Sequence, residues 1–162
     1  MKCIHCHENE PNKESGLCDN CEEKESSKIN GILYLPALGL CLAAVLAPIN
    51  FIKYLNMLSG DLPGYVAYYL YLGILILLID LFITYFTVWS FFKKKKNIKK
   101  VIIPYYIFNT VVTLYFTVFA SYLFKMPLDT PDIRALTSAA VGLIFWTPYF
   151  LFSKRIPVVF SK

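Results

Sequence analysis

Histidine and charged residues are scarce in this chain. Only two histidines occur among 162 residues, and both lie within the first seven. The motifs GxSxG and HExxH and the glycine-rich phosphate loop are missing, which argues against a serine hydrolase, a zincin protease or a P-loop nucleotide enzyme. Charged side chains make up 17% of the residues, against about 25% in an average soluble domain. We therefore expect no enzyme.

Hydrophobic side chains, in contrast, are abundant and unevenly distributed. They account for 57% of the residues, and aromatic side chains alone account for 17%. Residues 1–30 are mostly polar, with seven acidic side chains and four lysines, whereas most of the remainder falls in long apolar runs. This excess requires a hydrophobic solvent. The composition predicts a short polar segment followed by a membrane-embedded body.

Four apolar stretches are long enough to cross a bilayer. A helix that rises about 1.5 Å per residue needs about 20 residues to cross a hydrocarbon core of about 30 Å. The four stretches are residues 32–51, 65–92, 101–124 and 133–152. The first begins too far from the N-terminus for a cleaved signal peptide. Connections rich in turn-forming residues are short, so the predicted fold is an all-α membrane protein, a four-transmembrane-helix antiparallel bundle.

The basic side chains predict an orientation for this bundle. Of the sixteen Lys and Arg residues, thirteen lie before the first span, between the second and third, or after the fourth. Because positive side chains are retained in the cytoplasm, we expect both termini there. We expect the lysine run between the second and third spans to contact anionic lipid headgroups. Its members are Lys93, Lys94, Lys95, Lys96, Lys99 and Lys100. No aromatic-interleaved basic face accompanies them, so nucleic-acid binding is not expected.

Four of the five cysteines form two CxxC pairs near the N-terminus. The pairs are Cys3 with Cys6 and Cys18 with Cys21. Two intervening residues let both thiolates of a pair face one ion, and two such pairs complete a tetrahedral zinc site. We predict a structural zinc knuckle with these four ligands, in a segment too short to fold without its metal.

Other interpretations of the cysteines remain open. They are a disulfide pair, a redox-active CxxC, and a mixed site that uses His5 or His7. A reducing cytoplasm disfavours stable disulfides, and no thioredoxin-like pattern surrounds either pair. The fifth cysteine, Cys41, lies inside the first span and is expected to be a small buried apolar residue.

These patterns divide the chain into four parts. The predicted parts are a zinc-ribbon-like knuckle over residues 1–24, a linker over 25–31, the membrane domain over 32–153 and a cytoplasmic tail over 154–162.

Asp80 is the one ionisable residue deep within a predicted span. It lies about 20 Å along the helix from Lys93, near the membrane midplane, where a carboxylate is costly. Asp80 shares one helical face of the second span with Thr84 and Thr87, which together form a first polar stripe. A second polar stripe follows one face of the third span and consists of Thr110, Thr113, Thr117 and Ser121. The stripes are candidates for an ion-responsive site or a permeation path. The alternative, which we favour, is a protonated Asp80 that hydrogen-bonds across the helices, with the hydroxyl residues serving in packing.

The two ends of the apolar region resemble a bacterial membrane family. The matching residues are Gly31, Leu33, Leu35, Pro36, Ala37, Leu38, Gly39, Leu40, Pro48 and Ile49 at one end, and Trp146, Pro148, Tyr149, Phe150, Ser153, Arg155 and Phe160 at the other. Over roughly residues 31–160 the chain resembles the family known as domain of unknown function 2569. Ile32 and Ile156 depart from the residues usual in that family. The resemblance implies a four-span protein of the bacterial cytoplasmic membrane, and the cysteine pairs separately resemble short zinc ribbons. Neither resemblance implies an activity.

Two functional hypotheses follow from these observations. The leading one is a non-enzymatic membrane protein whose zinc knuckle docks a cytoplasmic protein partner or stabilises assembly. The alternative is a small transporter or channel, as a homo-oligomer, that uses Asp80 and the Thr/Ser stripes. Intramembrane catalysis is least favoured, because Asp80 has no second carboxylate near it in the spans.

Overall fold

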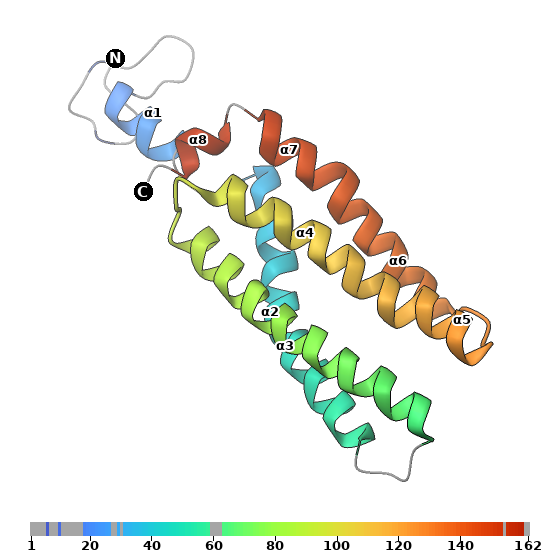
Figure 1. Cartoon of the computed structure of the whole chain (residues 1–162). Helices are drawn as coiled ribbons and strands as arrows, with labels where there is room; N and C mark the ends of the chain where they lie inside the picture. The colour runs from blue at the N-terminus through green and yellow to red at the C-terminus, as the bar shows by residue number, and fades with distance from the viewer. Residues whose placement is uncertain are drawn as a thin grey trace.

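The computed structural model describes Cys6, Glu10, residues 18–26, Ile29 and residues 31–58, 63–153 and 155–160. Within these residues the chain is helical throughout, apart from turns and connections (Figure 1). The helices in chain order are α1 (Asp19–Ser26), η1 (Gly31–Leu33), α2 (Tyr34–Met57), α3 (Gly64–Phe92), α4 (Ile98–Leu114), η2 (Tyr115–Phe119), α5 (Ala120–Phe124), α6 (Thr130–Val141), η3 (Gly142–Trp146), α7 (Thr147–Phe152) and α8 (Arg155–Val159).

These helices combine into four apolar rods that are long enough to cross a membrane. The rods are Gly31–Met57, Gly64–Phe92, Ile98–Phe124 and Thr130–Phe152, with mean hydropathy between 1.5 and 2.3. Each of the four predicted spans lies inside one rod. The predicted fold class, an all-α membrane protein with four spanning helices, is confirmed.

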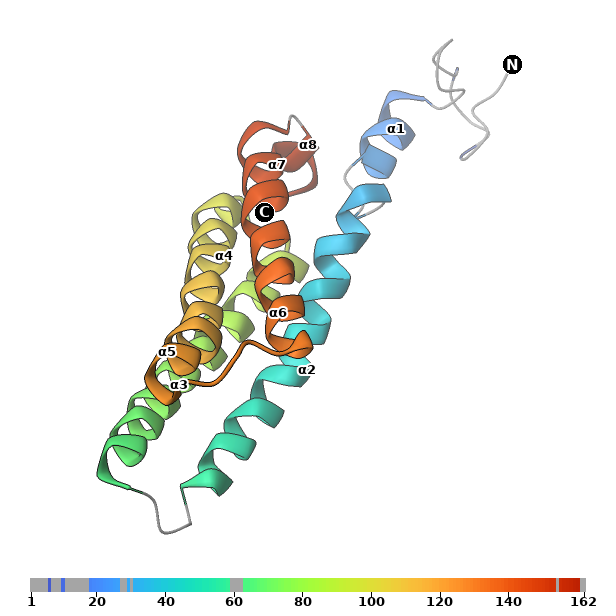
Figure 2. The same ribbon diagram turned by 90° about the vertical axis from the view of Figure 1, so that its right-hand side faces the viewer.

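Consecutive rods pack against each other as antiparallel neighbours. Helix α2 packs along α3, α3 along α4, and α4 along α6 and α7 (Figures 1 and 2). The third and fourth rods each contain a π-helical turn, η2 and η3. Pro148 lies within α7 just after η3 and lacks the N–H that would continue a regular α-helical ladder. The widened turn η3 therefore lies directly before the helical turn that contains this proline.

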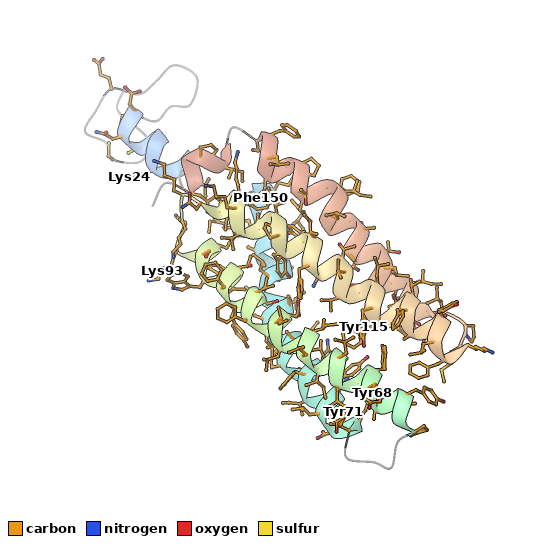
Figure 3. All side chains as sticks on the ribbon, viewed as in Figure 1. Lys24, Tyr68, Tyr71, Lys93, Tyr115 and Phe150 are labelled. Carbon is orange, nitrogen blue, oxygen red and sulfur yellow. The ribbon has the colours of Figure 1, made fainter. Side chains whose placement is uncertain are left out.

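The largest fully buried side chains of the described residues lie at the lysine-rich end, by which we mean the end of the bundle that carries Lys93–Lys100 and α8. The ring centroid of Phe91 lies 5.1 Å from that of Phe160 and 6.4 Å from that of Phe150, and all three side chains are fully buried. Phe150 is labelled in Figure 3. Helix α8 also buries Ile156 and Val159 in this core. Residues 155–160, predicted to lie in a tail, therefore close this end of the bundle.

The opposite end of the bundle is held by aromatic side chains. The rings of Tyr69 on α3 and Tyr115 in η2 stack with centroids 4.9 Å apart. The Tyr115 hydroxyl donates to the Tyr69 carbonyl oxygen at 2.8 Å, and the Tyr69 hydroxyl reaches the Tyr115 carbonyl oxygen at 3.5 Å. Tyr68 and Tyr71, labelled in Figure 3, are exposed instead. Tyr69 thus joins α3 to the third rod.

The connection between the third and fourth rods is set by local capping. Asp129 accepts a hydrogen bond from the Asp132 N–H at 2.9 Å, and Asp132 accepts one from the Asp129 N–H at 3.2 Å. This reciprocal capping box satisfies two N–H groups at the start of α6. Lys125 ends α5 in the left-handed region with φ 53°, a position that usually favours glycine. The turn predicted here from its prolines is therefore closed by aspartates.

Candidate functional site

Three of the four predicted cysteine ligands converge at the start of α1. The sulfur atoms of Cys6, Cys18 and Cys21 all lie within 4.8 Å of one another. Cys18 precedes α1 and Cys21 lies in its first turn, where its N–H donates to the Cys18 carbonyl oxygen at 2.9 Å. That turn brings both thiols of the second pair to one side. Cys3, the fourth predicted ligand, lies outside the described residues, as do His5 and His7.

The spacing of these sulfur atoms fits a metal ion. Two thiolates on one tetrahedral ion at about 2.3 Å each would lie about 3.8 Å apart. The Sγ atoms of Cys6 and Cys18 are 3.6 Å apart, which is close to that value and far longer than a disulfide bond of about 2.05 Å. Cys18 and Cys21 are both buried. The cluster can therefore hold a metal ion with three sulfur ligands from the described residues.

The cysteine cluster is not separate from the membrane domain. Helix α1 lies against α8, as Figure 1 shows. Ile29, between α1 and η1, packs against the core that contains Ile156 and Phe160. The segment predicted as a linker therefore includes a residue that contacts the lysine-rich end of the bundle.

A second candidate site is a cavity of about 690 Å³ inside the four-helix body. Four rods supply its lining: α2 contributes an apolar wall, α3 and α4 contribute polar side chains, and α6 with η3 forms the opposite wall. Wall residues on α2 such as Leu42 and Leu46 are more than half exposed. The cavity is consequently a groove that opens between α2 and α6, not an enclosed core void.

Asp80 lies in the wall of this groove. Its side chain is 7% exposed, and among the described residues its Oδ1 atom has no hydrogen-bond partner. A buried carboxyl oxygen without a partner costs free energy in any protein interior. Among the described residues that line the cavity there is no Lys, Arg or His, so Asp80 supplies its carboxyl group and faces no cation there.

The two predicted polar stripes meet only in part. Thr84 and Thr113 line the cavity with Asp80. Thr87 is fully buried and donates to the Ile83 carbonyl oxygen of its own helix at 2.7 Å. Thr110 and Thr117 donate to carbonyl oxygens of their own rod at 2.8 and 2.7 Å. Ser121 donates to the Met126 carbonyl oxygen at 2.6 Å, in the connection that follows the rod. All three residues lie outside the lining.

Several lining residues were not singled out from the sequence. Two of them, Tyr105 and Asn109, lie at intervals of four residues along the third rod with Thr113, which the sequence did single out, and this spacing places all three on one helical face. The spacing of four residues could have identified Tyr105 and Asn109 from the sequence, but a search for Thr and Ser alone misses them. Asn50 on α2 carries no such signal.

The prediction for Cys41 is wrong, because the structure places it on an exposed face of α2. On a membrane helix, a small apolar side chain is as stable in contact with lipid as it is inside the bundle.

The lysine run does not act as one uniform surface. Lys95 Nζ lies 3.4 Å from the ring centroid of Trp89, a cation–π contact. Lys99 Nζ donates to the Leu151 carbonyl oxygen at 2.9 Å and so caps the end of α7. Lys93, labelled in Figure 3, is exposed, as are Lys96 and Lys100. The expected contact of this run with anionic lipid headgroups stays a prediction, and Lys95 and Lys99 also make contacts within the protein.

The fold and the cysteine cluster define a four-span membrane protein with a potential metal centre at one end of the bundle. The chain belongs to the family described as protein of unknown function (DUF2569), whose model matches residues 26–161. This match confirms the resemblance carried by the two ends of the apolar region, and it leaves the cysteine segment almost wholly outside. The comparison with curated proteins found no match, and neither did the comparison with solved structures.

Proposed function

We propose that this is a non-enzymatic protein of the bacterial cytoplasmic membrane, with a structural zinc ion bound by Cys3, Cys6, Cys18 and Cys21. The zinc site organises the lysine-rich end of the bundle as a docking platform for a cytoplasmic partner. The observation that carries the proposal is the convergence of three cysteine sulfur atoms within 4.8 Å. The excess of basic side chains at this end favours its placement in the cytoplasm.

The chemistry of the donor set favours zinc in a structural role. Four cysteine ligands would close the tetrahedral shell and leave no position for a substrate or an activated water. Contact between α1 and α8 would transmit the order of the knuckle to the buried end of the bundle. The zinc would therefore hold a surface in shape and would not perform chemistry.

Crosslinking in native membranes tests the docking role. We expect wild-type protein to yield a crosslinked protein partner that is lost in Cys18→Ser and Cys21→Ser. The matched control is Cys41→Ser, because Cys41 lies on an exposed face of α2 away from the cluster. The same partner recovered at wild-type yield from all three variants would refute docking through the knuckle.

A second function is supported by the cavity: passage of an ion or small solute, in a monomer or homo-oligomer, with Asp80 as the binding group. The unpartnered Oδ1 atom of Asp80 in a groove lined by four rods favours it. Reconstitution in liposomes provides the test. We expect flux that falls at least tenfold in Asp80→Asn and is unchanged in Thr87→Val, whose side chain lies outside the lining. Equal flux in wild type and Asp80→Asn would exclude this function.

A further inference from the structure

We propose that the groove between α2 and α6 binds a lipophilic ammonium ion, a molecule with an apolar body and one positively charged amine. The inference uses the same cavity as the transport candidate above, but it requires binding only and no passage across the membrane. It rests on the charge, depth and wall chemistry of the groove.

The charge of the lining selects a cation over an anion. Asp80 is its carboxyl group, and no Lys, Arg or His in the described part of the chain lines the cavity to oppose it. A charge in a medium of low dielectric is stable only when it is paired and hydrogen-bonded. An ammonium group would donate to the unpartnered Oδ1 atom and would compensate the carboxylate at the same time. A carboxylate or phosphate ligand would add a second negative charge without compensation.

The depth of Asp80 selects a small polar group. Asp80 lies 16 residues into α3, which runs from Gly64 to Phe92, and is therefore near the middle of the rod. A phospholipid keeps its large headgroup at the membrane surface and would bring only its chains to this depth. A single amine at one end of an apolar molecule can reach Asp80 from the side of the groove.

The walls select the apolar body. Leu35, Leu42 and Leu46 on α2 face the lining and are each more than half exposed. Val141 on α6 and Trp146 in η3 line the opposite side. An alkyl or aromatic body would cover these side chains. The volume of about 690 Å³ lies within the usual range of about 300–1,000 Å³ for small-molecule sites.

Trp146 makes the site measurable. It lines the cavity, whereas Trp89 lies outside the lining under Lys95. The full-length protein in nanodiscs of zwitterionic lipid would be titrated with an alkyl ammonium ion that carries bromine on its chain, a quencher of tryptophan fluorescence. An alcohol and a carboxylate of equal length with the same bromine serve as comparison probes. Trp89→Phe leaves Trp146 as the reporter, and Trp146→Phe leaves Trp89 as the control.

We expect saturable quenching of Trp146 by the ammonium ion, with an affinity at least tenfold higher than for the alcohol or the carboxylate. Trp89 should show the same non-saturable quenching with all three probes. In Asp80→Asn the affinity for the ammonium ion should fall at least tenfold, while the affinity for the alcohol stays unchanged. Thr87→Val should bind as wild type does.

Gly39→Leu provides a variant that blocks the groove without depending on Asp80. A Cβ atom at Gly39 meets nothing within 4 Å, so a leucine side chain starts in open space at the wall of the cavity and would extend into it. We expect it to abolish saturable quenching while the protein remains folded.

Equal affinity for all three probes, measured by quenching of Trp146, would overturn the proposal. That result would identify a groove that takes up lipid-like molecules without selecting their charge. Ammonium binding that survives in both Asp80→Asn and Gly39→Leu would overturn it as well. A wild-type protein that is dimeric in the nanodisc and shows no saturable quenching would assign the groove to a second copy of the chain. Binding without liposome flux would refute transport alone, and flux without ammonium binding would refute this inference alone.

Discussion

The cysteine cluster and the membrane cavity are built in opposite ways. The cluster takes its ligands from one short segment, and a single turn at Cys18–Cys21 brings two of them together. The cavity takes its lining from four rods, and Asp80 and Asn109 both line it only because α2 and α6 leave a groove. A site of the first kind depends on its ion, and a site of the second kind depends on the packing of the whole bundle. The following predictions test that difference.

Loss of the metal should have the largest effect, and it should be strongest in the N-terminal segment and in α8, which contacts α1. We expect about one zinc per chain by metal analysis in wild type and almost none in Cys18→Ser, since structural zinc sites contribute about 10 kcal/mol or more to the folding of short segments. Hydrogen exchange should lose protection in α1 but keep it in α3 and α4. A variant with no zinc and full protection of α1 would contradict the dependence of the cluster on its ion.

Removal of the Phe160 ring should weaken the core at the lysine-rich end, which joins the segment after the cysteine cluster to the bundle. Phe160→Ala deletes a fully buried ring packed against Phe91, and we expect a loss of about 3 kcal/mol in stability. Thermal unfolding in nanodiscs measures it. Phe152→Ala serves as the control, because that ring is 82% exposed and should be replaced with little effect. Equal losses in the two variants would show that α8 does not close the bundle.

A methyl group at Gly142 should disturb the wall of the cavity. A Cβ atom there would lie 3.0 Å from the Tyr106 ring, so Gly142→Ala requires the ring or the backbone of η3 to shift. We expect a cost of about 1–3 kcal/mol in thermal unfolding. At Gly39, on the open side of the groove, Ala should be neutral or slightly stabilising, because helix propensity favours it. The opposite ranking of the two glycines would mean that the groove is closed in the membrane.

Removal of the Thr113 hydroxyl should have the smallest effect. That hydroxyl lines the cavity but donates to the Asn109 carbonyl oxygen of its own helix at 2.9 Å. Thr113→Val should therefore change the stability by less than about 0.5 kcal/mol, since such bonds in membrane helices contribute little. Chemical unfolding of the purified protein provides the measurement. A loss of several kcal/mol would show that the polar lining stabilises the fold.

The sequence predicted what depends on local pattern. Runs of about 20 apolar residues identify the four rods, because the bilayer requires every backbone group to bond within its helix. The CxxC spacing identifies the cluster for a similar reason, since Cys18 and Cys21 come together within one turn. Neither prediction required knowledge of how the rods pack.

The remaining features depend on packing and were not predictable in this way. Helix α8 has five residues and contains Pro157, so no periodicity marks it, and only its burial against Phe91 and Phe150 gives it a role. Asn50 and Asn109 line the cavity because the facing sides of α2 and α6 do not pack against each other. Polar residues in apolar sequence indicate where to search, but the partner helix decides whether they line a core or a cavity.

The contact between α1 and α8 has a consequence for the integrity of the chain. The two helices belong to the first and last parts of the fold, and the connection at residues 126–129 between α5 and α6 is exposed. A protease cut in that connection would interrupt the polypeptide without separating its halves. The fragment with α6–α8 would stay attached to the other fragment through α4 in the bundle and through α1 at its end. Two separately produced fragments are therefore expected to reassemble into the intact fold.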